Sequence, residues 1–266
     1  MNARIPVAPG KNQCRRSDGF DSAVFSRLAD REVGHFWFTC RNRIIIWVLK
    51  HYFHTKLSKF LELGCGTGFV LSGIEKSFTS LYSVGCDTHA EAFVYTNKRL
   101  SKARLILADG RRLPFKNSFD VVGAFDVLEH IPEDTEVLRE INSVLTPGGG
   151  IILTVPQHKF LYSYTDVIAC HVRRYNAAEL KEKVLNCGFE ILDMFSFVSI
   201  LFPMVVLRRL IWFKKNAVES GELPELAIPK FLNTFLSWIL HMECFLTRKG
   251  IRFNWGTSLV LVGRKI

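Results

Sequence analysis

Three glycines at alternate positions, Gly64, Gly66 and Gly68, follow an apolar stretch that begins at Lys59. Glycine tolerates both a positive φ and the close approach of a ligand to the backbone. A glycine-rich turn between a strand and a helix can therefore hold a ligand at the helix N-terminus. The spacing G-x-G-x-G departs from the dinucleotide fingerprint, whose third glycine would fall on Phe69. A plain strand-to-helix turn is the alternative that this loop alone leaves open.

Acidic side chains stand where the next three predicted strands end. They are Asp87, Asp109 and Asp126, after the apolar stretches 81–86, 105–108 and 119–125. In a sheet of parallel strands, ligands bind outside the carboxyl ends of the strands. A purely structural protein has no reason to place acidic side chains along that edge, so the pattern favours a bound cofactor. The structural alternative for Asp87 and Asp109 is capping of the helix that follows each strand.

The elements that position these residues alternate between strand-like and helical stretches. Further apolar strands are predicted over 59–63, 151–155, 189–197 and 258–262. A helix over 134–145 has its apolar side chains on one face and is ended by the run from Pro147 to Gly150. Nearly continuous apolar strands separated by helices indicate a parallel sheet that is covered on both faces. The predicted fold is α/β: a Rossmann-like, doubly wound, mostly parallel seven-stranded sheet with helices on both faces.

The 266 residues suit one domain with an elaboration. The predicted parts are a flexible tail (1–19), N-terminal helices (20–58), a core (59–199), an apolar and basic helical insertion (200–254) and a final strand (255–266). The apolar runs of the insertion are shorter than the roughly 18 to 20 residues that span a bilayer. The insertion is predicted to be a lid, a dimer interface or a hairpin on an anionic membrane surface. The oligomeric state is not predicted.

Net charge and cysteine content indicate which classes of partner, metal site and cellular location suit the chain. A formal charge of +10 favours anionic partners such as lipid head groups, phosphorylated molecules or nucleic acid. Seven cysteines without C-x-x-C or zinc-ligand spacing predict no metal site, and their odd number argues against a disulfide framework. Residues 1–16 lack the apolar core of a secretory signal. The expected location is cytoplasmic, with the inner face of the membrane as a peripheral alternative.

Residues 166–175, together with the HFWF stretch at 35–38 and the pair Arg41-Asn42, resemble a type 11/12-like bacterial subgroup of the class I S-adenosylmethionine (SAM)-dependent methyltransferases. The order and spacing of five further stretches resemble the successive motifs of that class. The stretches are LELGCGTG at 61–68, VGCD at 84–87, ADGRRLPF at 108–115, SFDVVGAFDVLEHI at 118–131 and LREINSVLTPGGGIILTVP at 138–156. The resemblance covers about residues 59–156. It implies a methyl-transfer enzyme that binds SAM and releases S-adenosylhomocysteine.

The resemblance also implies a role for each motif residue. Glu62 would orient the amino group of SAM, Asp87 would accept hydrogen bonds from both ribose hydroxyls, and Asp109 would meet the adenine amino group. Asp126 would lie at the methionine end. Further cofactor contacts are expected at Gly64, Cys65, Gly66, Gly68, Thr88 and Gly110.

Two histidines are candidates for the general base. His171 has a side chain whose pKa ordinarily lies near neutrality, and His130, just beyond the fourth strand, is its rival. Substrate contacts are expected from Arg173, Arg174, Tyr175 and Trp37, because arginine suits bidentate recognition of phosphate or carboxylate. The alternative is a loop that Asp166 anchors through one of the two arginines.

The predicted function is methyl transfer from SAM to a small-molecule or lipid-linked acceptor. The alternatives are a soluble small-metabolite methyltransferase with an ordinary lid, a nucleic-acid methyltransferase, and a catalytically silent SAM-binding protein. Nucleic acid is disfavoured because the chain lacks an N-P-P-Y-type tetrapeptide and its cations cluster around apolar stretches. The sequence does not fix whether the methylated atom is O, N or C, because the chemistry of SAM asks chiefly for alignment and exclusion of water.

Overall fold

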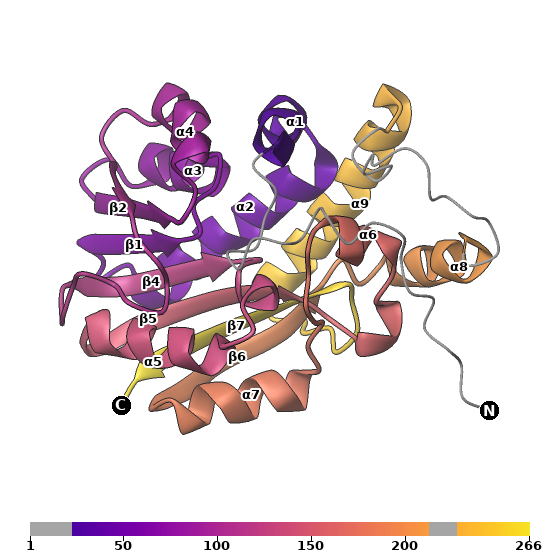
Figure 1. Cartoon of the computed structure of the whole chain (residues 1–266). Coiled ribbons are helices and arrows are strands. Elements are labelled where there is room, and N and C mark those ends of the chain that lie inside the picture. The colour runs from indigo at the N-terminus through magenta and orange to yellow at the C-terminus, as the bar shows by residue number, and fades with distance from the viewer. Residues whose placement is uncertain (1–22, 213–227) are drawn as a thin grey trace.

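The computed structural model describes residues 23–212 and 228–266. The predicted tail (1–19) and most of the polar linker at 216–229 lie outside the described residues. The described chain forms a seven-stranded sheet with helices on both faces (Figure 1).

The strands are β1 (Lys59–Leu63), β2 (Tyr82–Asp87), β3 (Arg104–Leu107), β4 (Phe119–Phe125), β5 (Leu145–Pro156), β6 (Phe189–Phe197) and β7 (Ser258–Lys265). Their order in the sheet is β3-β2-β1-β4-β5-β7-β6. β7 is antiparallel to both of its neighbours, and the other strands run in one direction. The predicted Rossmann-like, doubly wound fold class is confirmed.

The helices are α1 (Ala23–Glu32), α2 (Phe36–Val48), α3 (Phe69–Ser77), α4 (Phe93–Arg99), α5 (Asp134–Val144), α6 (Tyr164–Ile168), α7 (Ala177–Asn186), α8 (Phe202–Trp212) and α9 (Lys230–Arg248). A π-helical turn, Leu49–Phe53, extends α2. α5 and α7 cover one face of the sheet, whereas α2, α3 and α9 cover the other (Figure 1).

Alternation along the strands creates two hydrophobic cores, because successive side chains of a strand point to opposite faces. Phe60 and Val121 pack with α2, α3 and α9, while their neighbours Leu61 and Val122 pack with α5 and α7. All four side chains are buried. The near-continuous apolar strands of the sequence therefore reflect a sheet that is buried on both sides.

β5 begins at Leu145, six residues before the predicted start of this strand. Leu145 already pairs with Phe119, and regular pairing with β4 resumes at Gly150 after an irregularity. The helix ends at Val144, before the run from Pro147 to Gly150, and this run belongs to the extended strand instead of a turn that stops the helix. At Gly150 a Cβ atom would lie 2.2 Å from the Phe53 ring, so only glycine lets the π-helical turn pack on the strand.

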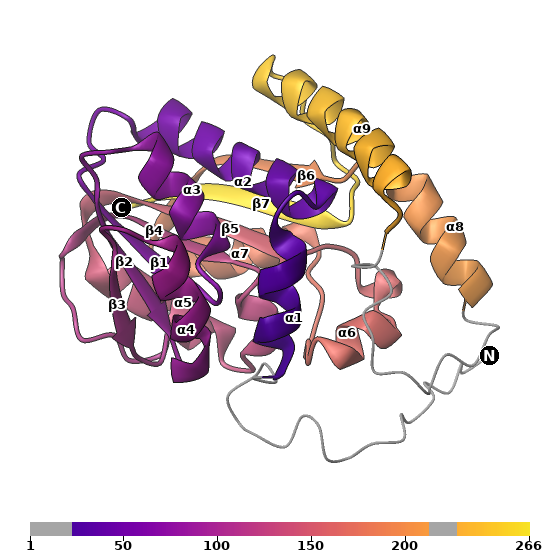
Figure 2. The same cartoon turned by 90° about the horizontal axis from the view of Figure 1, so that it is seen from above.

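The insertion between β6 and β7 packs on the sheet face through α9. Leu236, Leu240 and Cys244 are buried there, next to α2 residues. Asn233 ties the two helices, since its Oδ1 accepts from the Phe36 N–H and its Nδ2 donates to the Gly34 carbonyl, both at 2.9 Å. α8 and α9 lie along one side of the molecule (Figure 2). Among the described helices, none has the length and hydrophobicity that a membrane crossing requires.

Candidate active site

The glycine loop lies where the order of strands reverses. β1 has β2 on one side and β4 on the other, so the crossovers on its two sides lead in opposite directions. Crevices at such positions are the usual ligand sites of doubly wound sheets. Asp87 ends β2 and Asp126 directly follows β4, so both lie at the same edge as the loop. The structure thus brings these predicted residues to one edge.

The three glycines of the loop all have positive φ angles, +67°, +48° and +74° for Gly64, Gly66 and Gly68. A Cβ at Gly64 would lie 2.4 Å from Val127 Cγ2, and one at Gly68 would lie 2.6 Å from Thr96 Cγ2. At Gly66 the nearest atom would be 3.8 Å away. Packing therefore requires glycine at the first and third positions, whereas the middle one leaves space beside the backbone.

Asp87 is buried and already accepts hydrogen bonds from the loop. Its Oδ2 accepts from the Gly66 N–H at 2.8 Å, and its Oδ1 accepts from the His89 N–H at 2.9 Å. The second bond closes a local turn and is not a helix cap, because the N-cap of the following turn, Ala90–Ala92, is His89. A carboxylate offers about four acceptor positions, so these bonds leave capacity for two hydroxyl donors.

Glu62 is 2 % exposed and lies directly before the loop. Within the described residues its Oε2 has no hydrogen-bond partner. Burial raises the pKa of Glu62 well above its ordinary value, and the Arg41 charge opposes that rise. A buried acceptor without a donor is costly unless a ligand supplies one. A cationic amino group at this position would both complete the hydrogen bonding and favour the charged carboxylate.

Asp126 forms an ion pair with Arg41 of α2. The Arg41 guanidinium also lies over the Trp37 ring, 4.5 Å from its centre. Asp126 has a φ of +57°, and its N–H donates to the Thr154 carbonyl at 2.9 Å. Trp37 and Phe38 of α2 thus lie next to the edge of the site through Arg41, for which the sequence predicted no role. Trp37, a predicted substrate contact, lies beneath that guanidinium and is half-buried.

Glu32 of α1 was missed from the sequence. Its Oε2 accepts from Thr67 Oγ1 and from Arg99 Nη1, both at 2.5 Å. This network fastens α1 across the glycine loop. The three residues are far apart in the chain, and no local pattern connects them.

Asp109 lies at the exposed end of the site, with 38 % of its side chain accessible. It binds Arg111 in a bidentate pair, with Nη2 at 2.6 Å from Oδ2 and Nε at 3.0 Å from Oδ1. Hydrogen bonding from Arg111, against the opposing effect of burial, lowers the pKa of Asp109. Of the other predicted cofactor contacts, Gly110 follows Asp109 and is buried, and Cys65 is buried within the glycine loop. Thr88 is exposed.

The loop after α6 is anchored on Asp166, which is the alternative that the sequence left open. Asp166 accepts from His171 Nδ1 at 2.9 Å, from Arg174 Nε at 2.7 Å and from Arg209 Nη1 at 3.3 Å. Burial by itself would raise the pKa of Asp166, but the His171 hydrogen bond and the Arg174 charge hold it well below its ordinary range. Arg209 belongs to α8, so the insertion is tied to this loop.

The other predicted substrate contacts are also engaged in the fold. Arg173 Nη1 donates to Asp134 Oδ2 at 2.7 Å, and the Tyr175 hydroxyl donates to the same oxygen at 2.7 Å. Tyr175 is fully buried and Arg174 is 7 % exposed. These side chains hold the loop on the core, so we do not place Arg174 or Tyr175 against a substrate. Cys170 in this loop is disulfide-bonded, which the odd number of cysteines did not indicate.

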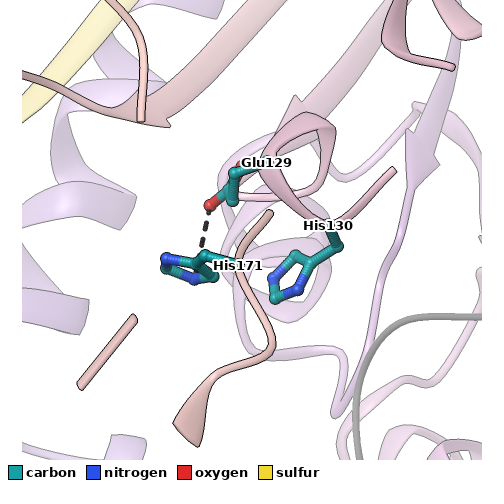
Figure 3. A group of neighbouring side chains, drawn as sticks. All are labelled: Glu129, His130 and His171. Carbon is teal, nitrogen blue, oxygen red and sulfur yellow. Dashed lines mark ion pairs between the residues drawn. The ribbon is translucent and has the colours of Figure 1, made fainter. Parts of the chain in front are cut away.

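The two histidines considered as general bases lie side by side. Their ring centres are 4.8 Å apart and the rings are nearly perpendicular, with Glu129 next to them (Figure 3). Burial, and then the neighbouring His171, lowers the pKa of His130 to about 3. His130 is therefore neutral at physiological pH and a weak base. His171 donates through Nδ1 to Asp166, which leaves the Nε2 lone pair available to a proton or a cation.

Known proteins resemble the chain over this same region. Residues 61–153 match a family model described as a methyltransferase domain. A protein of Mycolicibacterium smegmatis, named "Probable S-adenosylmethionine-dependent methyltransferase", is 28 % identical over 163 residues, which cover 60 % of this chain and 61 % of the relative. A demethylmenaquinone methyltransferase of Staphylococcus aureus is 30 % identical over 127 residues, or 44 % of this chain and 53 % of that protein. The chain thus spans less than two thirds of these relatives.

A similar fold occurs in a solved complex between the Haloferax volcanii Trm112 methyltransferase activator and a methyltransferase. The TM-score is 0.58 at 17 % identity, with 92 % of this chain and 93 % of that chain covered. At this identity the likeness concerns the fold alone.

Proposed function

Because this chain belongs to the class I SAM-dependent methyltransferases of the type 11 kind, we propose that it transfers a methyl group from SAM to a small, apolar or lipid-linked acceptor. The observation that carries the cofactor assignment is the buried Oε2 of Glu62, which has no hydrogen-bond partner among the described residues. It lies at the start of the glycine loop, where the cationic amino group of SAM would supply the missing donor.

The residues around the loop fit the rest of the cofactor. Asp87 has acceptor capacity left for the ribose hydroxyls, Asp109 stands at the exposed end for the adenine, and the Gly66 backbone leaves space for the methionine chain. Bound SAM supplies an activated methyl group on a sulfonium. The chain aligns the donor and excludes water, and these effects account for much of the catalysis of such a displacement.

Binding of SAM is expected to release a proton from Glu62. Burial raises the pKa of Glu62, so without ligand its carboxyl stays protonated above the ordinary carboxyl range. An ammonium group beside it lowers that pKa, and the proton leaves at any pH between the two values. Calorimetric titration in buffers of different ionisation enthalpy would measure the release, which disappears at a pH above the raised pKa.

The variant Glu62→Gln keeps the shape of the side chain and cannot release a proton. It is expected to bind SAM about tenfold more weakly or worse, with no buffer-dependent heat. Equal proton release from the variant and the natural chain would contradict the Glu62 assignment. Failure of the natural chain to bind SAM at all would contradict the proposed cofactor.

The acceptor class is proposed from an exposed stripe on α9. Its large apolar residues recur every three or four positions and are 42–77 % exposed: Phe231, Phe235, Trp238, Met242 and Phe245. That spacing places them on one face of the helix. An exposed apolar patch of this kind marks an interaction site. The Staphylococcus aureus relative is named for a demethylmenaquinone substrate, and an apolar acceptor of that general kind suits the stripe.

Charge favours an anionic lipid surface as the partner of this stripe. Lys230, Arg248 and Lys249 are exposed at the ends of α9. The one acidic residue in the sequence between 228 and 255 is Glu243, which is buried and accepts from the Ser199 and Ile200 N–H groups. An apolar face with cations at its edges is typical of helices that lie in the interface of an anionic membrane. Arg209 of α8 pairs with Asp166 and so joins the first helix of the insertion to the loop that carries His171.

Vesicle sedimentation tests this partner. The natural chain is expected to pellet with vesicles containing phosphatidylglycerol and to release at high salt, because part of the attraction is electrostatic. Replacing Phe235 and Trp238 by serine should weaken binding by about tenfold or more, since each apolar side chain contributes roughly 1.5–3 kcal/mol when buried.

The matched control replaces two exposed apolar residues outside the insertion, Val94 of α4 and Leu185 of α7, by serine. It is expected to sediment like the natural chain. Retention of the natural chain in the supernatant would contradict the proposed binding to a membrane. It would favour a soluble small-metabolite methyltransferase with an ordinary lid. Salt-sensitive binding to RNA in place of vesicles would instead support a nucleic-acid acceptor.

A further inference from the structure

We propose that Glu129, His130 and His171 form a binding site for a divalent transition-metal ion beside the methyl-transfer site. Each residue contributes one ligand atom, and these atoms all lie within 4.8 Å of one another (Figure 3). Glu129 and His130 belong to the 3-10 turn Leu128–His130 that follows β4 and Asp126. His171 reaches them from the loop after α6. The spacing of the cysteines predicted no metal site, whereas the ligands proposed here are two histidines and a glutamate.

The strongest indication is the state of Glu129. Its side chain is 0 % exposed, and neither carboxylate oxygen has a hydrogen-bond partner among the described residues. Such a group is costly in a protein interior unless it is paired or binds a metal ion. The Nε2 atom of His171 is 3.9 Å from Glu129 Oε1, beyond hydrogen-bond distance.

His171 is oriented as metal-binding histidines usually are. Its Nδ1 donates to the buried carboxylate of Asp166 at 2.9 Å, which fixes the tautomer and directs the Nε2 lone pair towards Glu129. Metal-ligating histidines almost always donate their other ring N–H to a carboxylate or carbonyl in this way. The Val172 N–H donates to the Glu129 carbonyl at 2.8 Å, so the backbone holds the loop against the turn. His130 offers its ring nitrogen to the same group, and neutral imidazole is a common metal ligand.

The donor set selects the class of ion. Two imidazoles and one carboxylate suit Zn²⁺, Mn²⁺, Fe²⁺ or Co²⁺, whereas Mg²⁺ and Ca²⁺ prefer oxygen ligands throughout. At tetrahedral angles, ligand-to-metal distances near 2.0–2.2 Å would place neighbouring ligand atoms roughly 3.3–3.6 Å apart. Binding would therefore draw the ligand atoms, now within 4.8 Å of one another, together by up to roughly 1.5 Å. Three protein ligands leave coordination positions for water or for an oxygen of an acceptor.

Titration of the full chain with Co²⁺ after chelator treatment tests the site directly, and its readout does not depend on methyl transfer. We expect one bound equivalent with weak visible absorption and without the intense charge-transfer band that thiolate ligands produce. Zn²⁺ should displace the cobalt. Glu129→Gln and His171→Asn are each expected to lower the affinity by about 100-fold, more than the loss that follows when only a supporting partner of a ligand is removed.

His54→Asn is the matched control, because His54 is exposed and lies outside the cluster. It should bind Co²⁺ like the natural chain. Circular dichroism and SAM binding verify that each variant folds. If Glu129→Gln does not fold, His171→Asn still tests the site. Absence of stoichiometric Co²⁺ binding by the natural chain would overturn the proposal, as would unchanged binding in both ligand variants. Those results would make Glu129 a buried protonated acid and His171 a general base.

Discussion

Replacing Asp87 by alanine is expected to lower the affinity for SAM by at least about 100-fold, because two hydrogen bonds to a charged acceptor are lost at roughly 1.5–3 kcal/mol each. The variant also loses the bond from the Gly66 N–H, which shapes the loop around the methionine end. The fold should persist, since Asp87 stands at the end of β2 and does not belong to the buried apolar cores. Isothermal titration with SAM measures the affinity, and circular dichroism verifies the fold.

Asp120→Ala is the matched control for Asp87. Asp120 also accepts backbone N–H groups, from Ser58 and Lys59 at 2.9 Å, but at the start of β4 and so at the opposite edge of the sheet. Its removal should reduce stability and leave SAM affinity unchanged. A fully active SAM site in Asp87→Ala would show that the ribose assignment is wrong, and equal losses in both variants would mean that the effect is structural.

Asp166→Ala is expected to be the most destabilising change outside the hydrophobic cores. The carboxylate is 0 % exposed and pairs with His171, Arg174 and Arg209. Removing one partner of a buried ion pair leaves an uncompensated charge and costs about 3–5 kcal/mol. For a chain of this size that corresponds to a fall in melting temperature on the order of 10 °C. SAM affinity should change little, because the loop contributes no residue to the glycine turn.

Glu179→Ala provides the comparison for Asp166. Glu179 also pairs with a cation, Lys159 at 2.7 Å, but 31 % of its side chain is exposed. Exposed pairs are worth about 1 kcal/mol or less. Thermal unfolding of both variants would separate the two cases, and a fall in melting temperature for Asp166→Ala no larger than for Glu179→Ala would contradict the anchoring role.

Much of the fold was predictable because it depends on local pattern. The apolar strands, the glycine turn and the acidic strand ends are all readable within short windows of sequence, and the parallel sheet follows from their alternation. The start of β5 was not readable, because Leu145 to Gly150 look like a helix end followed by a turn. Their extended pairing with β4 depends on Phe119 and on the neighbouring Phe53, which are distant in sequence.

The residues of the site were predictable only where they belong to one continuous sequence motif. The pairing of Asp126 with Arg41 spans 85 residues, and that of Glu32 with Arg99 spans 67. No periodicity reports such contacts. The sequence suggested either a substrate or Asp166 as the partner of the arginines, and only the tertiary arrangement shows that Arg174 binds Asp166. Glu129 lies within the motif at 118–131, but the motif predicts no role for it, because its burial beside His171 depends on how a loop some 40 residues later folds back.

Methyl transfer itself is the most direct test of the proposed function. Purified protein is incubated with methyl-labelled SAM and a total cell extract, and the label is then partitioned between organic and aqueous phases. The account predicts label in the organic phase, dependent on the natural chain and absent with Asp87→Ala. Label confined to the aqueous phase would contradict the proposal of an apolar acceptor. The α9 stripe would then have no part in acceptor binding. No transfer to any fraction, despite SAM binding, would contradict the enzyme and leave a SAM-binding protein.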